Sequence, residues 1–442
     1  MNTSFWLRLA ARGSYLGEQR LKREFYRRSL ANRTRREINH AQLHQLNFIW
    51  NHAVSRVPYY IELKRKLGLP DQFPDLKSFF HSVPPLIKAE IQTDPRRFVT
   101  LDRVPGKWLQ TSGSTGQPLS VFRGSAVHRQ IRLDSHFHRR QWGVEWHHPR
   151  LMLWGDDTYF FRSIIGRFRL LGKRLAGKLK NRYHINAYFL NEGSLERCYR
   201  LMAQGRVRML YSYSQAAMRL AQFCRNRTPL KGLKLVVLSS EYIDAASMIE
   251  LEEIFGCPVV REYGAIETGI IAADFPGSPL RIMEHRLVVE TPPCKNGMCD
   301  ILVTCLENPY YPLFRYRLED LTSAPMMIPE HGAAHLVDIL GRVNDLLMMP
   351  GGKWLHSAYV TQAIRAVVPA KRFQIVQEKP DHLHIRLETT RVITAAEKER
   401  IRFRLSCASS QKIRITIVEN EAFENSPGGK HRFVIRHGGF HP

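Results

Sequence analysis

The sequence predicts an α/β protein with a large N-terminal domain of mixed sheets and helices and a small α+β C-terminal domain. Short apolar runs alternate with helical patterns from about residue 105 to about residue 340, which is typical of strands buried between helices. After Gly341-Arg342 the pattern changes to strands around a single helix. The length of 442 residues suggests about two or three folding units.

The N-terminal 40 residues form a basic extension that we expect to be helical, and Ala41–Arg56 continues with a helical pattern. Further along the large domain, apolar runs predict buried strands at Arg150–Trp154, Val207–Tyr211, Leu233–Leu238 and Cys257–Val260. A helix is expected at Ala245–Phe255, because Asp244 is a good N-cap and Gly256 a good C-terminal stop.

Antiparallel strands are expected at Leu287–Glu290 and Asp300–Thr304. In the small domain the patterns predict strands Phe373–Val376, His382–Leu387 and Arg414–Val418 and a helix Ala395–Leu405. We therefore divide the chain into an extension (1–40), a large domain (41–341) and a small domain (342–442).

The formal net charge of +26 is concentrated in residues 8–36 and 162–182. A field of this sign attracts nucleic acid, acidic lipid, nucleotides or an acidic carrier protein. Apolar residues recur at three- and four-residue steps in 161–182, which predicts a basic amphipathic helix. A solvated surface helix, a docking surface for an acidic partner and contact with a membrane surface remain open. No zinc-finger spacing, aromatic RNA-binding pattern or paired-helix DNA reader occurs, so we expect no specific nucleic-acid recognition.

No apolar run approaches about 18 residues, so no transmembrane helix is expected. The first ten residues are too short and too broken by Arg8 for a signal peptide, which predicts a cytoplasmic protein. The seven cysteines are scattered, so we expect free thiols and no disulfide framework. Cys294, Cys299 and Cys305, with His285 near them, leave a zinc site as the minor alternative.

The most informative motif is the run Gln110–Pro118, which contains two glycines and four hydroxyl residues. Backbone N–H groups in such a loop form a concavity that binds anions, and hydroxyl groups add donors. The loop lacks the glycine spacing and the lysine of Walker ATPases. Taken alone, it is either a phosphate-binding loop or a plain Ser/Gly surface turn.

Four further segments follow this loop in order. They are Glu262–Gly269, Phe314–Leu321, Leu340–Asp345 and Ser426–Arg432. Tyr263 comes after a buried strand and can stack on a planar base. Glu267 offers a hard oxygen ligand that suits Mg²⁺ on a nucleotide phosphate. Asp320 lies in a loop pattern and can accept hydrogen bonds from both hydroxyls of a ribose.

This ordered set resembles the adenylate-forming superfamily, and within it the branch of phenylacetate–CoA ligase, coenzyme F390 synthetase and CapK-like proteins. Val57–Tyr60 and Val83–Lys88 also resemble that branch, and the resemblance runs over most of the chain. It implies an N-terminal domain that binds ATP and an acid, and a small C-terminal domain that rotates between two half-reactions.

The resemblance assigns roles to matching residues. The ATP phosphates would be held by Thr111, Ser112, Gly113, Ser114, Thr115 and Gly116. Ser240 and Glu241 would lie at the adenine edge, with Tyr263 and Gly264 against the base. Glu267 would bind Mg²⁺, and Asp320 and Arg342 would hold the ribose. Asp345 would be the hinge, and Lys430 would reach the α-phosphate.

The implied activity is an ATP-dependent acid ligase that forms an acyl-adenylate and then a thioester with CoA or with the phosphopantetheine of an acidic carrier protein. Transfer to an amine and a non-catalytic scaffold are the alternatives. The acid pocket is expected near His136–His138, Tyr211–Ser214 and Gly264–Ile266. Either histidine is a candidate general base, and a structural role is the alternative.

The chain departs from the family pattern at three places. Glu319 stands before Asp320 where the family usually has glycine. Gln117–Leu119 ends the phosphate loop where many relatives carry lysine, and Asp274–Pro276 stands where the branch often has cysteine. These changes bear on the substrate and on efficiency more than on ATP binding.

Overall fold

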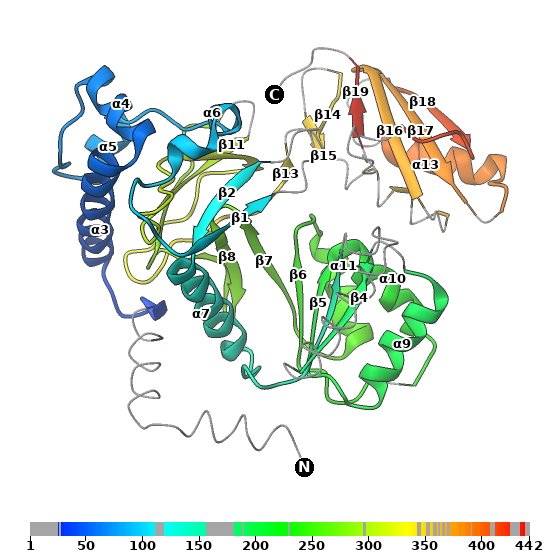
Figure 1. The fold of residues 1–442 in the computed structure, drawn as a ribbon. Helices are drawn as coiled ribbons and strands as arrows, with labels where there is room; N and C mark the ends of the chain where they lie inside the picture. Colours follow the sequence, from blue (N-terminus) through cyan, green and yellow to red (C-terminus); the bar gives the residue numbers. More distant parts are fainter. Residues whose placement is uncertain are drawn as a thin grey trace, which may run out of the picture.

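The computed structural model describes residue 25 and residues 28–437, apart from 111–118, 156–180, 188–189, 229, 295–297, 343–345, 351–353, 357–359, 361–362, 365–366, 369–371, 390, 407–411 and 425–433. Figure 1 shows a large part that contains the longest sheet and a smaller C-terminal part, drawn in orange and red. The predicted fold class is confirmed.

A seven-stranded sheet forms the centre of the large domain, in the order β4-β3-β5-β6-β7-β8-β9. Its strands are β3 (Arg150–Trp154), β4 (Arg182–Asn186), β5 (Met209–Tyr213), β6 (Leu235–Ser239), β7 (Val259–Ala265), β8 (Gly269–Phe275) and β9 (Ser278–Ile282). The pairings from β4 to β7 are parallel, whereas β7–β8 and β8–β9 are antiparallel. The short apolar runs predicted strands buried between helices, and the structure adds that those from β4 to β7 are parallel.

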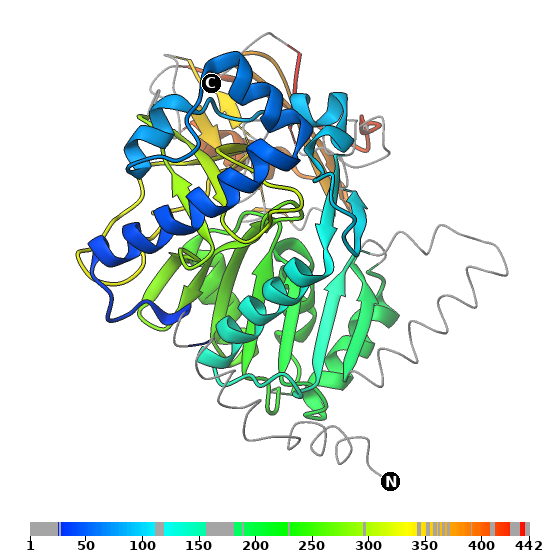
Figure 2. The ribbon, with the colours of Figure 1, turned by 60° about the vertical axis from the view of Figure 1, so that its left-hand side comes forward.

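Helices cover both faces of this sheet. On one face, α9 (Glu192–Ala203), α10 (Ser214–Cys224) and α11 (Ala245–Phe255) pack against alternate strand residues such as Leu151 and Leu210. On the other face, α7 (Ser125–Gln141) packs on β8 and runs obliquely across the sheet in Figure 2.

A second, antiparallel sheet has the order β10-β11-β12-β13. Its strands are β10 (Leu287–Glu290), β11 (Cys299–Cys305), β12 (Tyr316–Thr322) and β13 (Gly341–Arg342). Before it in the chain come a hairpin of β1 (Gly106–Gln110) and β2 (Ser120–Gly124), and the elements α3 (Arg35–Arg56), α4 (Pro58–Leu67), α5 (Leu76–Ser82), α6 (Lys88–Thr93) and η1 (Pro95–Phe98). Trp50 of α3 is fully buried, and its ring centroid lies 5.2 Å from that of Phe314 in an edge-to-face contact. These helices therefore share an apolar core with the second sheet.

The C-terminal part has its own core. Its sheet has the order β18-β17-β16-β19, and a short pair β14–β15 precedes it. The elements are β14 (Leu346–Met348), β15 (Trp354–His356), β16 (Arg372–Lys379), β17 (His382–Glu388), α13 (Ala395–Ser406), β18 (Arg414–Glu419) and β19 (Val434–Arg436). Ile375, Ile385 and Ile401 are fully buried between this sheet and α13. The α+β pattern predicted for this part is confirmed.

Several element boundaries differ from the predictions. Helix α11 begins and ends where the caps predicted, with Asp244 accepting from the N–H of Ser247 and Gly256 in the left-handed conformation. Helix α3 begins at Arg35, where Thr34 and Glu37 form a capping box, and it therefore crosses the boundary drawn between the extension and the large domain. The basic helix predicted at 161–182 lies almost wholly outside the described residues.

The expectation of free thiols is wrong for one pair. Cys294 and Cys299 form a disulfide, because the β10–β11 hairpin brings their Cα atoms to 4.1 Å. Among the described cysteines, Cys198, Cys224, Cys257 and Cys305 are free. The described residues contain no group of three or more residues that could hold a metal, and His285 bonds to Asp134 instead.

Within the described parts of the chain, no helix is both long and apolar enough to cross a membrane.

Candidate functional site

Four of the predicted site residues, Ser240, Glu241, Tyr263 and Gly264, lie at the ends of neighbouring strands of the seven-stranded sheet. In open α/β sheets, ligands bind where the carboxyl ends of parallel strands meet. Ser240 comes directly after β6, and Tyr263 and Gly264 lie at the end of β7. The two strands are joined here, because Ser239 Oγ donates a hydrogen bond to the backbone oxygen of Glu262 at 2.7 Å.

The structure brings Tyr263 and Asp320 together. The Tyr263 hydroxyl donates to Asp320 Oδ2 at 2.9 Å, although 57 residues separate them in the sequence. Arg342 lies directly opposite Asp320 in the β12–β13 register. The residue predicted to face adenine and the two predicted to hold ribose therefore share one place.

An irregularity in β12 positions Asp320. One residue of β11, Ile301, faces three residues of β12, Leu318 to Asp320, so β12 carries a bulge. A bulge bends its strand and redirects side chains. Glu319 within it has a φ of +65°, the left-handed region that favours glycine. This backbone would suit a glycine, the residue that the family pattern leads us to expect before Asp320.

Glu267 lies in the turn between β7 and β8. The Tyr316 hydroxyl donates to its Oε1 at 3.2 Å, and this proximity, after burial, raises the pKa of Tyr316. Gly264 and Gly269 keep the turn closed, since a Cβ on Gly264 would lie 2.3 Å from Gly269 O. Arg123 of β2 donates to the backbone oxygen of Ile266 in the same turn.

The predicted phosphate loop lies between the paired strands β1 and β2 in the sequence. Thr111–Gly116 lie outside the described residues, but their flanks are placed, with Gln110 opposite Ser120. Because Arg123 of β2 also reaches the Glu267 turn, the hairpin that carries the loop lies beside the other predicted residues.

The Ser240–Glu241 segment has an unusual backbone. Ser240 has a φ of +69°, a conformation that non-glycine residues adopt rarely and often at functional sites. The Glu241 carboxylate accepts from the backbone N–H of Gln215 at 2.8 Å, in the first turn of α10. Glu241 thus connects the end of β6 to the helix that follows β5.

Besides Thr111–Gly116, two further predicted site residues lie outside the part of the chain that the structure describes. Asp345 and Lys430 lie outside the described residues, and of Arg342 only the backbone is described. The segment around Lys430 is fixed on both sides to β16. Before it, the Glu424 N–H donates to Gln374 Oε1 at 3.0 Å; after it, β19 pairs with β16.

The predicted acid pocket contains a buried polar cluster that sequence reasoning missed. The Tyr211 hydroxyl donates to Glu262 Oε1 at 2.8 Å, and Arg139 of α7 lies 3.4 Å from Glu262 Oε2. Burial alone would raise the pKa of Glu262, but Arg139, with His138 and Tyr211, lowers it to about 2. Glu262 is therefore an anion in the folded protein.

The two histidines expected in this region have packing roles in the structure. His138 is fully buried, and its Nε2 donates to the backbone oxygen of Asp274 at 2.9 Å. His136 packs on Phe25 at 5.4 Å, and burial lowers its pKa to about 4. This supports the structural alternative for both residues over a general base.

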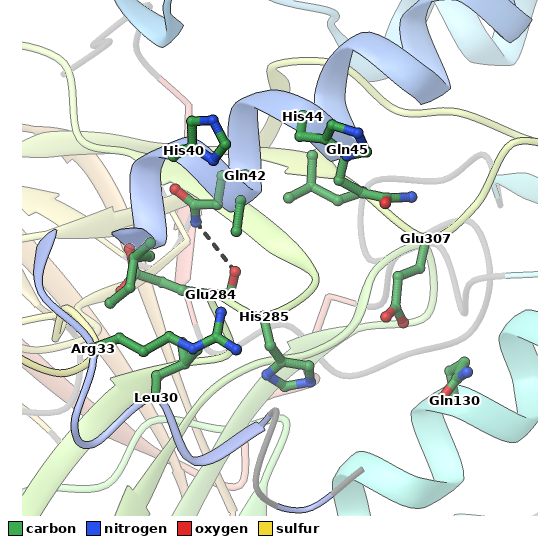
Figure 3. A pocket seen from close by; sticks show the side chains of 13 residues that line it. Leu30, Arg33, His40, Gln42, His44, Gln45, Gln130, Glu284, His285 and Glu307 are labelled. Atoms are coloured by element: carbon green, nitrogen blue, oxygen red, sulfur yellow. Dashed lines mark hydrogen bonds between the residues drawn. The ribbon is translucent and has the colours of Figure 1, made fainter. Parts of the chain in front are cut away.

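A cavity of about 550 Å³ lies away from these residues, between α3, α7 and the loop before β10 (Figure 3). Its wall includes His285, which meets the buried Asp134 at 2.8 Å. Arg28 also reaches Asp134 at 2.9 Å, and Arg286 contacts it as well. Burial alone would raise the pKa of Asp134, but Arg286 and His285 hold it well below its usual range. This cluster joins the N-terminal segment to α7 and to the turn before β10, and apart from His285, the zinc candidate, it includes no predicted site residue.

The chain resembles known proteins in its C-terminal sequence and in its fold. Residues 347–437 match the family model of the CapK C-terminal domain. A structure of 2-hydroxyisobutyryl-CoA ligase in the postadenylation state with 2-HIB-AMP is similar at 17% identity and a TM-score of 0.71, covering 92% of this chain and 91% of that one. This chain has the adenylate-forming fold.

The same ligase in its thioesterification state, with 2-HIB-AMP and CoA, gives a TM-score of 0.57 at 17% identity, covering 92% of this chain and 91% of that one. Curated proteins gave no significant match. At these identities the likeness establishes the adenylate-forming fold alone, and the activity must be argued from the residues of this chain.

Proposed function

We propose that this protein is an ATP-dependent carboxylic acid ligase that forms an acyl-adenylate and then a thioester. The observation that carries the proposal is the hydrogen bond between Tyr263 and Asp320, with Arg342 opposite, beside the hairpin of the Ser/Gly loop. The Tyr263 ring would lie on adenine, and the Asp320 carboxylate would accept from the ribose hydroxyls.

In the first half-reaction a carboxylate oxygen of the acid attacks the α-phosphorus of ATP, and the bond to pyrophosphate breaks. Negative charge builds on the phosphoryl oxygens, where Lys430 would donate a hydrogen bond. Glu267 fits the role of a Mg²⁺ ligand, because such ions take one or two carboxylates together with substrate phosphates. Bound Mg²⁺ would neutralise charge on those phosphates.

In the second half-reaction a thiolate attacks the acyl carbon and AMP leaves. CoA is the acceptor we favour, and a similar fold has been solved with CoA in its thioesterification state. An acidic carrier protein also suits the net charge of +26. Rotation of the small domain about Asp345 would move Lys430 away from the α-phosphate and open a channel for the thiol.

The acid would lie between α7 and the carboxyl ends of β3 and β5. The ring centroids of Trp154 and Tyr213 lie 4.2 Å apart there with the rings tilted by 30°, and the centroids of Trp154 and Tyr211 lie 5.1 Å apart. These rings favour an acid with a planar or aryl part, as in the phenylacetate–CoA ligase branch.

ATP–pyrophosphate exchange over a panel of aryl, aliphatic and sugar acids tests the proposal. We expect exchange that depends on one class of acid and falls about 10²–10³-fold in Lys430→Ala, the loss typical of one preorganised donor. Lys412→Ala, an exposed lysine of the same domain, is the matched control. ATP binding without exchange for any acid would favour a non-catalytic scaffold, and exchange without a thioester product would favour transfer to an amine.

A further inference from the structure

The face of the sheet that α7 overlooks carries an excess of positive charge. Arg150 and Arg182 are the first residues of β3 and β4 and lie side by side in the parallel register. Arg139 of α7 reaches the same face, because its guanidinium lies 5.1 Å above the ring of Tyr211. Arg132 lies seven residues, about two helical turns, before Arg139 and therefore on the same side of α7.

Arg150 is the unusual member. Arg150 is only 9% exposed, and among the described residues its hydrogen bond runs from Nη2 to the backbone oxygen of Trp146 at 2.8 Å. The Nε atoms of Arg150 and Arg139 are buried without a hydrogen-bond partner among the described residues. A buried guanidinium that meets no carboxylate costs several kcal/mol.

The charges that act on Arg150 are all of its own sign. Burial, together with the charges of Arg139, Arg182 and Arg132, lowers the pKa of Arg150 to about 9. In the described part of the chain, the carboxylate found in this cluster is Glu262, which Arg139 already contacts at 3.4 Å. An added anion would therefore relieve repulsion and satisfy buried donors together.

Arg150 and Arg182 lie at the end of the proposed acid site that is farther from the ATP site. Side chains of β3 alternate, so Trp154, Met152 and Arg150 share the face toward α7. Trp154 marks the carboxyl end, where the reacting carboxylate must meet ATP, and Arg150 lies four residues, about 13 Å, further along the strand. Tyr211 lies between them, beside Met152 in the register. Aromatic rings therefore lie near the carboxyl end of β3, where the reaction would occur, and Arg150 and Arg182 lie at the opposite end.

We infer that the acid substrate carries a second anionic group, which the arginines at the start of β3 and β4 bind, with a planar or apolar part between the two charges. The inference rests on the proposed function and names the class of its substrate: a dicarboxylic acid, or an acid with a distal phosphate, about 8–13 Å long. Recognition of the distal charge would discriminate against a neutral analogue by about 10- to 100-fold in kcat/KM, the effect of one charge-assisted hydrogen bond.

The experiment compares paired acids in ATP–pyrophosphate exchange. The pairs are 3-(4-carboxyphenyl)propanoate against 3-(4-carbamoylphenyl)propanoate, and suberate against its monoamide. We expect the dianion to be preferred and the preference to fall about tenfold or more in Arg150→Gln. Arg197→Gln, an exposed arginine of α9 on the opposite face of the sheet, should keep the preference. If Arg150→Gln does not fold, Arg182→Gln, an exposed neighbour on β4, takes its place.

A thermal shift without ATP separates this inference from the proposed function. Stabilisation by the dianions that depends on Arg150, without exchange, would support the anion site and contradict the ligase activity. Equal exchange with both members of each pair, unchanged in Arg150→Gln, would overturn the inference and leave the ligase activity intact. Stabilisation by inorganic phosphate alone, with no discrimination between paired acids, would overturn the assignment to the substrate. Neither exchange nor stabilisation would contradict both.

Discussion

Replacing Asp320 by asparagine tests the nucleotide site most sharply. The asparagine oxygen can still accept from the Tyr263 hydroxyl, which lies 2.9 Å from the present carboxylate, so the contact that places the side chain is kept. What is lost is the negative charge and one acceptor for the ribose hydroxyls. A hydrogen bond to a charged group contributes about 1.5–3 kcal/mol, so we expect Asp320→Asn to weaken ATP binding by about 2–3 kcal/mol, or 30- to 150-fold in Kd.

Calorimetric titration of ATP measures this loss, and 2′,3′-dideoxy-ATP identifies its source. The dideoxy compound should bind the wild-type protein as weakly as ATP binds Asp320→Asn, and the variant should not distinguish the two nucleotides. This double comparison isolates the contact between carboxylate and diol.

Tyr263→Phe is the matched control. It removes the same hydrogen bond but keeps both the carboxylate and the ring, so the Kd for ATP should change less than about fivefold. The reasoning is refuted if Asp320→Asn binds ATP as the wild type does, or if the dideoxy compound loses the same factor in both proteins.

Three other predictions follow from the geometry. Glu319→Gly should raise the free energy of unfolding in urea by about 0.5–1 kcal/mol, because it relieves a φ of +65°, whereas Glu319→Ala should not. Glu267→Gln should lower the rate of exchange about 10²-fold and raise the Mg²⁺ concentration needed, and an unchanged Mg²⁺ dependence would exclude it as a ligand. Burial lowers the pKa of His136 from 6.5 to about 4, so as the pH falls the unfolded chain protonates His136 before the folded protein does. The free energy of unfolding is therefore unaffected by His136 above pH 6.5 and decreases as the pH falls from 6.5 toward 4. In His136→Phe the decrease in the free energy of unfolding between pH 6.5 and pH 4 should be smaller by about 1–2 kcal/mol than in the wild type. Identical pH profiles of unfolding for the two proteins would contradict this.

Local signals explain which elements could be predicted from the sequence. Helix α11 was predicted with its bounds because Asp244 and Gly256 mark both ends. The strand predicted at Val207–Tyr211 lies two residues later, at Met209–Tyr213, because the polar end Tyr211–Tyr213 resembles a loop. Such residues face a site as well as the core, so hydrophobicity alone does not place the end of the strand.

The candidate site likewise contains residues that the sequence could predict and contacts that it could not. Tyr263, Glu267 and Asp320 could be proposed because each lies in a segment with its own motif, although Asp320 lies within β12 and not in the loop that was expected. The contact of Arg139 with Glu262 could not be proposed, since 123 residues separate them and Arg139 lies in no recognisable motif. Which charges remain unpaired on the α7 side of the sheet depends on that packing, so the class of acid becomes arguable only from the structure.

The proposal that the protein activates its acid as an acyl-adenylate is tested most directly by following one oxygen atom. An acid labelled with oxygen-18 in its carboxylate is incubated with ATP, Mg²⁺ and CoA, and the nucleotide and phosphate products are examined by mass spectrometry. We predict one labelled oxygen in AMP, because the carboxylate oxygen that attacks the α-phosphorus stays with AMP when the thiolate takes the acyl group. Label in inorganic phosphate, with ADP as the nucleotide product, would contradict adenylation.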